Sequence, residues 1–261
     1  MWRLSILRVC GGTVTLIVTL AAAGLFLAGC AGLGRSGDLS TLDIATRFLP
    51  MPATVPHADS LQNVQLQEDD GRLVLESELS FGHLWQRWSS GYRVERGTDL
   101  FEAGRMRSFA TLWSRELRLK QFDQRTSVGA YAREEAEREI ASRVDAPHAE
   151  SIVIDVHVYI DRRNRSSYGA TSLRSAGWTI FLRTDDGDEY QPESIDATWA
   201  QPINWSGNER AHYRQNTLRF ERVNDDGEDI LHDTSTLELH IRDSVASTDK
   251  LFGWRFDDMP E

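Results

Sequence analysis

The segment IVIDVHVYID, residues 152–161, constrains the fold more than any other part of the sequence. Its apolar side chains occupy every second position, and its polar side chains occupy the positions between them. This period of two is typical of a β-strand with one buried face. We therefore predict that one face lies in the core and the other meets solvent; the polar set is Asp155, His157, Tyr159 and Asp161.

Three Asp-Asp-Gly tripeptides separate further strand-like segments, at residues 69–71, 185–187 and 225–227. Asp-Gly tolerates the positive φ that a tight hairpin turn requires. The first turn predicts a β region over about 62–84, and STLELHIRD at 235–243 alternates in the same way as 152–161. Short strands separated by turns favour an antiparallel β-sandwich over residues 151–261.

Between these β regions the period changes to that of a helix. TSVGAYAREEAEREIASRV, residues 126–144, places apolar residues four apart from Val128 to Val144 and pairs opposite charges four apart on the other faces. We expect this helix to end before Pro147, which cannot continue it. The preceding segment 99–122 is also expected to be helical, with Met106, Phe109, Leu112 and Trp113 on one face.

This layout resembles that of a loose group of uncharacterised bacterial lipoproteins with a C-terminal β domain. The likeness covers about Ser108 to Phe256 and rests on the order of SFATLWSREL, the helical stretch, GWTIFLRTDDGDEYQPESI, LRFERVNDDG and LFGWRF. It implies an α+β fold, with a helical segment packed on an antiparallel C-terminal β-sandwich. It brings no catalytic residues with it.

The N-terminus has the parts of a secretory signal: Arg3 and Arg8, then an uncharged run from Gly11 to Gly29. LAGC at 27–30 resembles the lipobox of bacterial prolipoproteins, which implies cleavage before Cys30 and acylation of its thiol. The only other cysteine, Cys10, would leave with the signal. The alternative is an uncleaved transmembrane helix, since about 20 apolar residues span a bilayer.

Domain boundaries follow from these features. Residues 1–29 are expected to be the signal peptide, and residues 30–60, which are rich in Gly and Pro, a lipidated tether. Residues 61–150 would hold a β-hairpin and the helical segment, and 151–261 the β-sandwich. Ala31 follows the cysteine, which resembles the outer-membrane default of bacteria with two membranes and places the domain in the periplasm.

The charge of the chain excludes one class of partner. The chain has 29 Lys and Arg against 40 Asp and Glu, a net charge of −11. An acidic surface argues against nucleic acid and anionic headgroups as partners. The membrane is therefore expected to be reached through the lipid anchor.

No motif for a cofactor, a metal or covalent catalysis stands out. The Asp-Asp-Gly segments lack the ligand spacing of a calcium loop and are better explained as turns. Asp155, His157, Glu238 and His240 would hold a metal only if their two strands were neighbours. No Gly-x-Ser-x-Gly elbow and no phosphate-binding glycine loop is present. We therefore expect no cofactor and no metal.

Tryptophan is the residue type that most favours a binding role, because the chain has eight. Trp85, Trp88, Trp199 and Trp205 are the candidate platform for a glycan or protein. The leading hypothesis is a non-enzymatic envelope module that binds such a partner. The alternative is a cell-wall or glycan hydrolase that uses surface carboxylates.

Overall fold

The computed structural model describes residues 39–96, 107–161, 172–174, 177–206, 209–243 and 248–257. Residues from Leu39 onward form one compact unit. The expected signal peptide, Cys30 and the first part of the tether lie outside the described residues, as does Met106. No helix within the described ranges is both long enough and apolar enough to cross a membrane.

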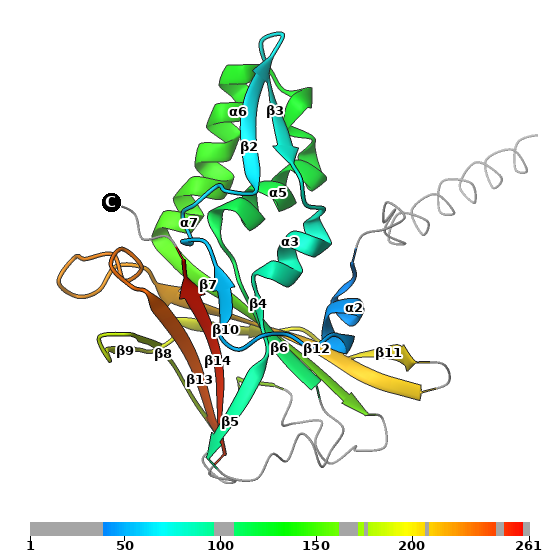
Figure 1. Cartoon of the computed structure of the whole chain (residues 1–261), viewed down its shortest axis with the longest axis vertical. Helices are drawn as coiled ribbons and strands as arrows, with labels where there is room; N and C mark the ends of the chain where they lie inside the picture. The colour runs from blue at the N-terminus through cyan, green and yellow to red at the C-terminus, as the bar shows by residue number, and fades with distance from the viewer. Residues whose placement is uncertain are drawn as a thin grey trace, which may run out of the picture. The chain divides into compact units, whose positions relative to one another are not determined.

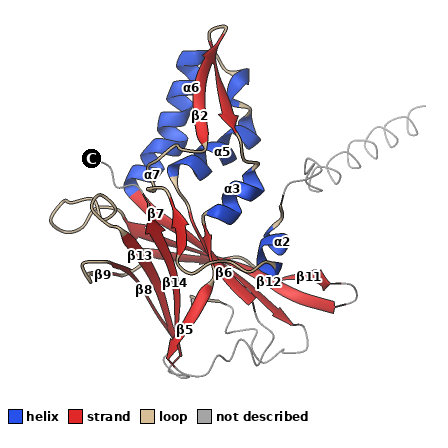
Figure 2. Cartoon of the chain, viewed as in Figure 1, coloured by secondary structure: helices blue, strands red, loops and turns tan. Residues whose placement is uncertain are grey.

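Two six-stranded sheets make up most of the structure (Figures 1 and 2). The first, called sheet 1, has the order β1-β14-β13-β8-β9, and β5 also pairs with β14. All of its pairs are antiparallel except the parallel pair of β1 and β14. Its strands are β1 (Ala53–Val55), β5 (Tyr92–Arg96), β8 (Trp178–Thr184), β9 (Glu189–Tyr190), β13 (Thr236–Asp243) and β14 (Thr248–Phe256).

Sheet 2 has the order β10-β12-β7-β6-β4, and β11 also pairs with β12. All of its pairs are antiparallel. Its strands are β4 (Ser89–Ser90), β6 (Arg107–Leu112), β7 (Ser151–Asp161), β10 (Ser194–Ala197), β11 (Gln201–Ser206) and β12 (Glu209–Glu221).

A hairpin and several helices complete the unit. The hairpin joins β2 (Val64–Asp69) to β3 (Arg72–Ser77) through Asp70 and Gly71, whose φ angles are 47° and 73°. It packs against the 3₁₀ turn η2 and against α6, which Figures 1 and 2 show beside the hairpin. The helices are α2 (Thr41–Thr46), α3 (Phe81–Arg87), α5 (Arg115–Thr126), η2 (Val128–Ala130), α6 (Arg133–Ile140), the π-helical turn η3 (Ala141–Asp145) and α7 (Ala146–Glu150).

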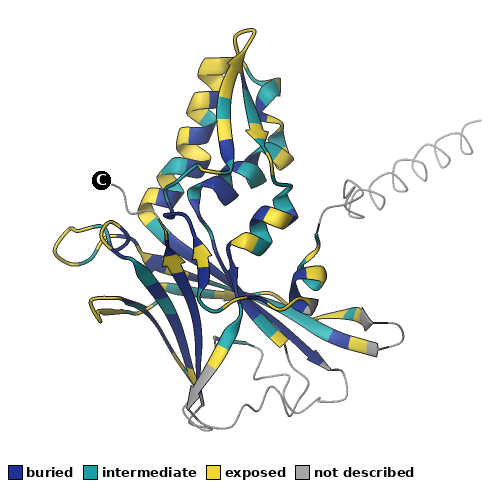
Figure 3. Ribbon diagram, in the orientation of Figure 1, coloured by how far each residue is buried: buried dark blue, intermediate teal, exposed yellow. Residues whose placement is uncertain are grey.

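Both sheets contribute to one hydrophobic core. The apolar face of β7, from Ile152 to Ile160, belongs to the same buried cluster as Leu237, Leu239 and Ile241 of β13. Figure 3 shows these strands mostly in the colour of buried residues, whereas the tip of the β2–β3 hairpin is exposed. The mixed α+β class is thus confirmed, and β7 and β13 are strands whose alternate apolar side chains lie in the core.

The polar face of β7 differs from its prediction. Asp155, His157 and Tyr159 are at most 2% exposed, although the pattern predicted that they would meet solvent. Phe109 of β6 and Tyr213 of β12 stack on His157 from either side, at ring-centroid distances of 4.5 and 5.9 Å. β7 is therefore buried on both faces, which a period of two does not reveal.

The helical predictions are partly wrong. Residues 107–112 form strand β6, so the helix begins only at Arg115, where the Ser114 side chain accepts a hydrogen bond from the Leu117 amide. The later helix is interrupted by the π turn η3 and continues past Pro147, which lies in the first turn of α7. A proline is tolerated there because the first turn needs no amide donor.

Two expected boundaries also differ. Residues 39–60 are not a free tether end: Ile44, Leu49 and Val55 are buried, and β1 extends sheet 1. The boundary expected at residue 150 cuts through sheet 2, because β4 and β6 precede it and β7 follows it. The helical segment and the strands therefore share one fold.

Candidate functional site: an arginine pocket

A pocket of about 480 Å³ lies between α5 and the β7–β12 pair of sheet 2. Its volume falls within the range of small-molecule sites. We call it the arginine pocket, because four of its twelve lining residues are arginines. It is lined by Trp113, Arg118, Gln121, Phe122, Arg125, Thr126, Arg143, Val153, Asp155, Gln215, Thr217 and Arg219.

Secondary structure explains why these side chains converge. On α5, Arg118, Gln121, Phe122 and Arg125 have the spacing i, i+3, i+4 and i+7, so they share one helical face. In sheet 2, Thr217 pairs with Asp155 and Arg219 pairs with Val153, so these residues lie side by side on one sheet face. A helical face and a sheet face thus form the two walls of the pocket.

Arg118 is the most deeply placed cation of the pocket. Its Nε donates to the Trp113 carbonyl at 3.4 Å, whereas its Nη2 is buried and has no hydrogen-bond partner among the described residues. Burial lowers the pKa of Arg118 to about 10, and the neighbouring charge of Arg219 adds to this effect. The side chain remains a cation at neutral pH, but one whose charge is incompletely compensated.

Asp155 is the one carboxylate that lines the pocket, and its oxygens are already engaged. Oδ2 accepts hydrogen bonds from Trp113 Nε1 at 2.7 Å and from Gln215 Nε2 at 2.8 Å. Oδ1 accepts one from Thr217 Oγ1 at 2.6 Å. Asp155 therefore positions the polar floor of the pocket and has little hydrogen-bonding capacity left for a ligand.

Arg143 enters the pocket from the π turn η3. π-helical turns are rare and occur often at functional sites. Arg143 forms an ion pair with Glu139 at 2.6 Å. For Arg125 and Arg219, no ion pair with a carboxylate is found within the described part of the chain.

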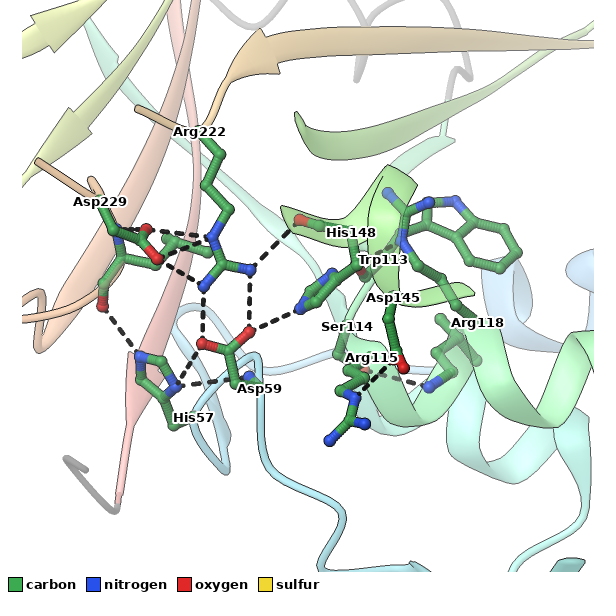
Figure 4. Close-up of polar contacts among 12 residues, drawn as sticks. His57, Asp59, Trp113, Ser114, Arg115, Arg118, Asp145, His148, Arg222 and Asp229 are labelled. Atoms are coloured by element: carbon green, nitrogen blue, oxygen red, sulfur yellow. Dashed lines mark hydrogen bonds and ion pairs between the residues drawn. The ribbon is translucent and has the colours of Figure 1, made fainter. Parts of the chain in front are cut away.

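An ion network lies to one side of Trp113 and Arg118 (Figure 4). Arg222, whose side chain is 6% exposed, forms ion pairs with Asp59 at 2.6 Å and with Asp229 at 2.8 Å. His148 contacts Asp59 through Nε2 at 2.7 Å. The network, which we call the Arg222 network, joins the N-terminal segment, α7 and the end of β12.

The network determines how its groups titrate. Burial alone would raise the pKa of Asp59, but the hydrogen bonds from His148 and Arg222 outweigh it and hold this pKa well below its usual value. Burial lowers the pKa of His148, so the ring is neutral at neutral pH. All the guanidinium nitrogens of Arg222 donate to partners, and we therefore assign the network a structural role.

Of the four tryptophans predicted as a platform, three have described side chains, and these differ widely in exposure. Trp88 is fully buried and donates from Nε1 to the buried Glu116 at 2.7 Å, so its predicted surface role is wrong. Trp85 is half-buried against the core, and its Nε1 donates to Thr111 at 2.8 Å. Trp199 is 90% exposed, and the side chain of Trp205 lies outside the described residues.

The metal hypothesis for Asp155, His157, Glu238 and His240 fails, because β7 and β13 belong to different sheets. The turns at Gly187 and Gly227 have positive φ angles of 91° and 84°, as tight turns require. No group of three or more potential metal ligands occurs in the part of the chain that the structure describes.

Acidic side chains from these two turns instead line a second depression of about 410 Å³, which we call the acidic hollow. Its carboxylates are Asp186, Asp188, Glu228, Asp229 and Asp233. Of these, Asp229 belongs to the Arg222 network.

Comparisons with known proteins give no match: no family model matches the chain, and neither curated proteins nor solved structures yielded a significant similarity.

Sequence reasoning missed all four arginines of the pocket. The spacing of Arg118 and Arg125 indicates that they share one helical face. This signal is usable only if the helix is known to begin at Arg115. Arg143 and Arg219 had no local signal, because the turn η3 and the pairing of β12 with β7 bring them to the pocket.

Proposed function

We propose that this protein is a non-enzymatic binding module of the bacterial cell envelope that captures an anionic group of a protein or glycan in the arginine pocket. One observation carries the proposal: four arginines line one pocket in a chain with a net charge of −11. Guanidinium groups bind carboxylates and phosphates through paired hydrogen bonds. Concentrating them in a cavity of an acidic protein costs electrostatic repulsion, which a bound anion would relieve.

The state of Asp155 supports binding over catalysis. A general acid or base must exchange a proton with the substrate. Asp155 accepts three hydrogen bonds from its neighbours, and the other charged groups that line the pocket are arginines, which do not titrate near neutral pH.

We further propose that the two sheets pack as a β-sandwich with the helical segment packed on it. The core cluster shared by β7 and β13 supports this arrangement. Upstream of the described residues, we propose that acyl groups on Cys30 hold the module on the membrane. In a bacterium with two membranes, this would be the periplasmic face of the outer membrane.

Calorimetric titration of the full chain in detergent with citrate, at constant ionic strength, tests the binding proposal. We expect saturable binding that weakens at least about tenfold in an Arg125→Gln/Arg219→Gln variant, because charge-assisted hydrogen bonds are lost. The matched control is Arg255→Gln on β14, an exposed arginine outside the pocket. Equal affinities in all three proteins, or no binding, would reject the proposal.

Membrane fractionation tests the anchor separately. Cys30→Ser should move the protein from the membrane fraction to the soluble fraction, because two or more acyl chains are what make such an anchor stable. Retention of the variant in the membrane fraction would favour an uncleaved N-terminal helix.

The alternative, a hydrolase of cell-wall glycans, rests on the carboxylates of the acidic hollow. Release of reducing ends from purified cell walls would support it if Asp188→Asn and Glu228→Gln each abolished the release. Release that persists in both variants would come from elsewhere and count against this alternative.

A further inference from the structure

We propose that the arginine pocket selects a doubly negative phosphate monoester on a hydroxylated molecule over a singly negative group. This inference rests on the proposed function and adds the charge and the chemical class of the ligand.

The charge count of the pocket comes first. Four guanidinium groups line it, against the carboxylate of Asp155 within it and Glu139 paired to Arg143 beside it. Two positive charges thus lack a counter-charge among the described residues. A monoanion would neutralise one of them, whereas a phosphate monoester at neutral pH carries a charge of about −1.5 to −2 and three acceptor oxygens.

The charge of Arg118 also favours such a group. Its Nη2 is buried, has no hydrogen-bond partner among the described residues, and lies in the repulsive field of Arg219. The negative charge of a phosphate in the pocket would screen the two guanidinium groups from each other.

The rest of the lining suits hydroxyl groups. Gln121 makes no side-chain hydrogen bond with the described residues, and the hydroxyl oxygens of Thr126 and Thr217, which donate elsewhere, can still accept. Trp113 and Phe122 add aromatic surface. A volume of about 480 Å³ exceeds what a phosphate alone would fill, so it leaves room for the molecule that carries the phosphate.

The charged groups that line the pocket are arginines and one carboxylate, and no histidine is among its described lining residues. The charged groups that face the ligand are Arg118 and Arg125 on α5, Arg143 on η3, Asp155 on β7 and Arg219 on β12. Other charged groups nearby form ion pairs: the carboxylate of Glu139 with Arg143, and the carboxylates of Asp59 and Asp229 with Arg222. His148 and His157 lie nearby, and burial lowers the pKa of both rings.

A matched pair of ligands tests the inference: glucose 6-phosphate and glucose 6-sulfate, titrated into the full chain in detergent. The sulfate ester has similar shape but stays singly charged. At pH 7.5 we expect the phosphate to bind at least about tenfold more tightly. Since its second pKa is about 6, its dianionic fraction and its affinity should fall about fourfold by pH 5.5, whereas the affinity of the sulfate ester should not change.

Three controls separate the outcomes. Arg219→Gln should remove most of the preference for the phosphate, and Arg255→Gln should leave it intact. Inorganic phosphate should bind more weakly than glucose 6-phosphate if the hydroxyl-facing residues contribute. Equal binding of the two esters, a pH-independent preference, or equal binding of inorganic and sugar phosphate would overturn the inference. If only this inference fails, citrate should still bind. If citrate does not bind, the proposed function itself is rejected.

Discussion

Histidine 157 should make the protein less stable as the pH falls from about 7 to 4. The ring is fully buried between Phe109 and Tyr213, and burial lowers its pKa to about 4, although the charge of Asp155 opposes this effect. Its Nε2 has no hydrogen-bond partner among the described residues, so a protonated ring would leave a donor unsatisfied.

The sign and size of the effect follow from linkage. In the unfolded chain the ring has a pKa of about 6.5, so below that pH the unfolded state binds a proton that the folded state does not. The difference of about 2.5 pKa units corresponds to about 3 kcal/mol of unfolding free energy. This stability is present above pH 6.5, is lost progressively down to about pH 4, and does not change further below it.

Urea unfolding at pH 7, 6, 5 and 4 measures the effect. His157→Phe keeps an aromatic ring in the stack but cannot titrate, so its stability should fall by about 3 kcal/mol less than that of the natural protein over this range. The contribution of His148, which has the same sign, remains in both proteins and cancels in the difference. His232→Gln, an exposed histidine, is the control. Parallel pH profiles for the natural protein and His157→Phe would refute the reasoning.

Four further substitutions separate structural roles from binding roles. Arg222→Met should destabilise the fold by about 3 kcal/mol, the lower end for a broken buried ion pair because its partner carboxylates are 43% and 36% exposed. Arg133→Gln, in a half-exposed pair, should have a much smaller effect in the same urea assay. Trp88→Phe should lower the unfolding free energy by about 2 kcal/mol, because it removes a hydrogen bond to a buried carboxylate. It should leave the citrate affinity unchanged in calorimetry. A loss of citrate affinity without a loss of stability would support the predicted surface role of Trp88. Arg219→Gln should weaken citrate binding. It should also raise the unfolding free energy by a few tenths of a kcal/mol, since it removes the repulsion between Arg219 and Arg118. A lower unfolding free energy would indicate that Arg219 has a structural role.

The sequence predicted those elements whose signal is local. The alternation in β7 and β13 and the positive-φ glycines of the Asp-Asp-Gly turns depend on neighbouring residues, and these strands and turns are present. The signal for helix α6 is also local. Two of the predicted pairs of opposite charges four residues apart are formed, Arg133 with Glu137 at 2.9 Å and Glu139 with Arg143 at 2.6 Å.

The predictions failed where tertiary pairing decides the structure. Residues 107–112 contain good helix formers, yet they pair along β7 as strand β6. The polar face of β7 is buried because β6 and β12 bring aromatic rings onto His157, which no periodicity within β7 encodes. The indole N–H of Trp88 was compatible with a surface role, but in the core it donates a hydrogen bond to the buried carboxylate of Glu116.

The pocket could not be predicted for the same reason. Its arginines come from α5, η3 and β12, and only the packing of α5 beside the β7–β12 pair brings them together. The overall negative charge pointed away from an anion site, because a net charge does not describe how charges are distributed. The proposed lipid anchor differs from the pocket, because its whole sequence signal is the local motif that ends at Cys30.

The most direct test of the central claim is to observe the pocket itself while an anion binds. The indole N–H of Trp113 lines the pocket and is bonded to Asp155, whereas those of Trp88 and Trp254 are buried in the core and bonded to other partners. In ¹H–¹⁵N NMR spectra of the full chain in detergent, the Trp113 indole signal should shift saturably with citrate, while the other two stay in place. An unmoved Trp113 signal at high citrate would contradict an anion site in this pocket.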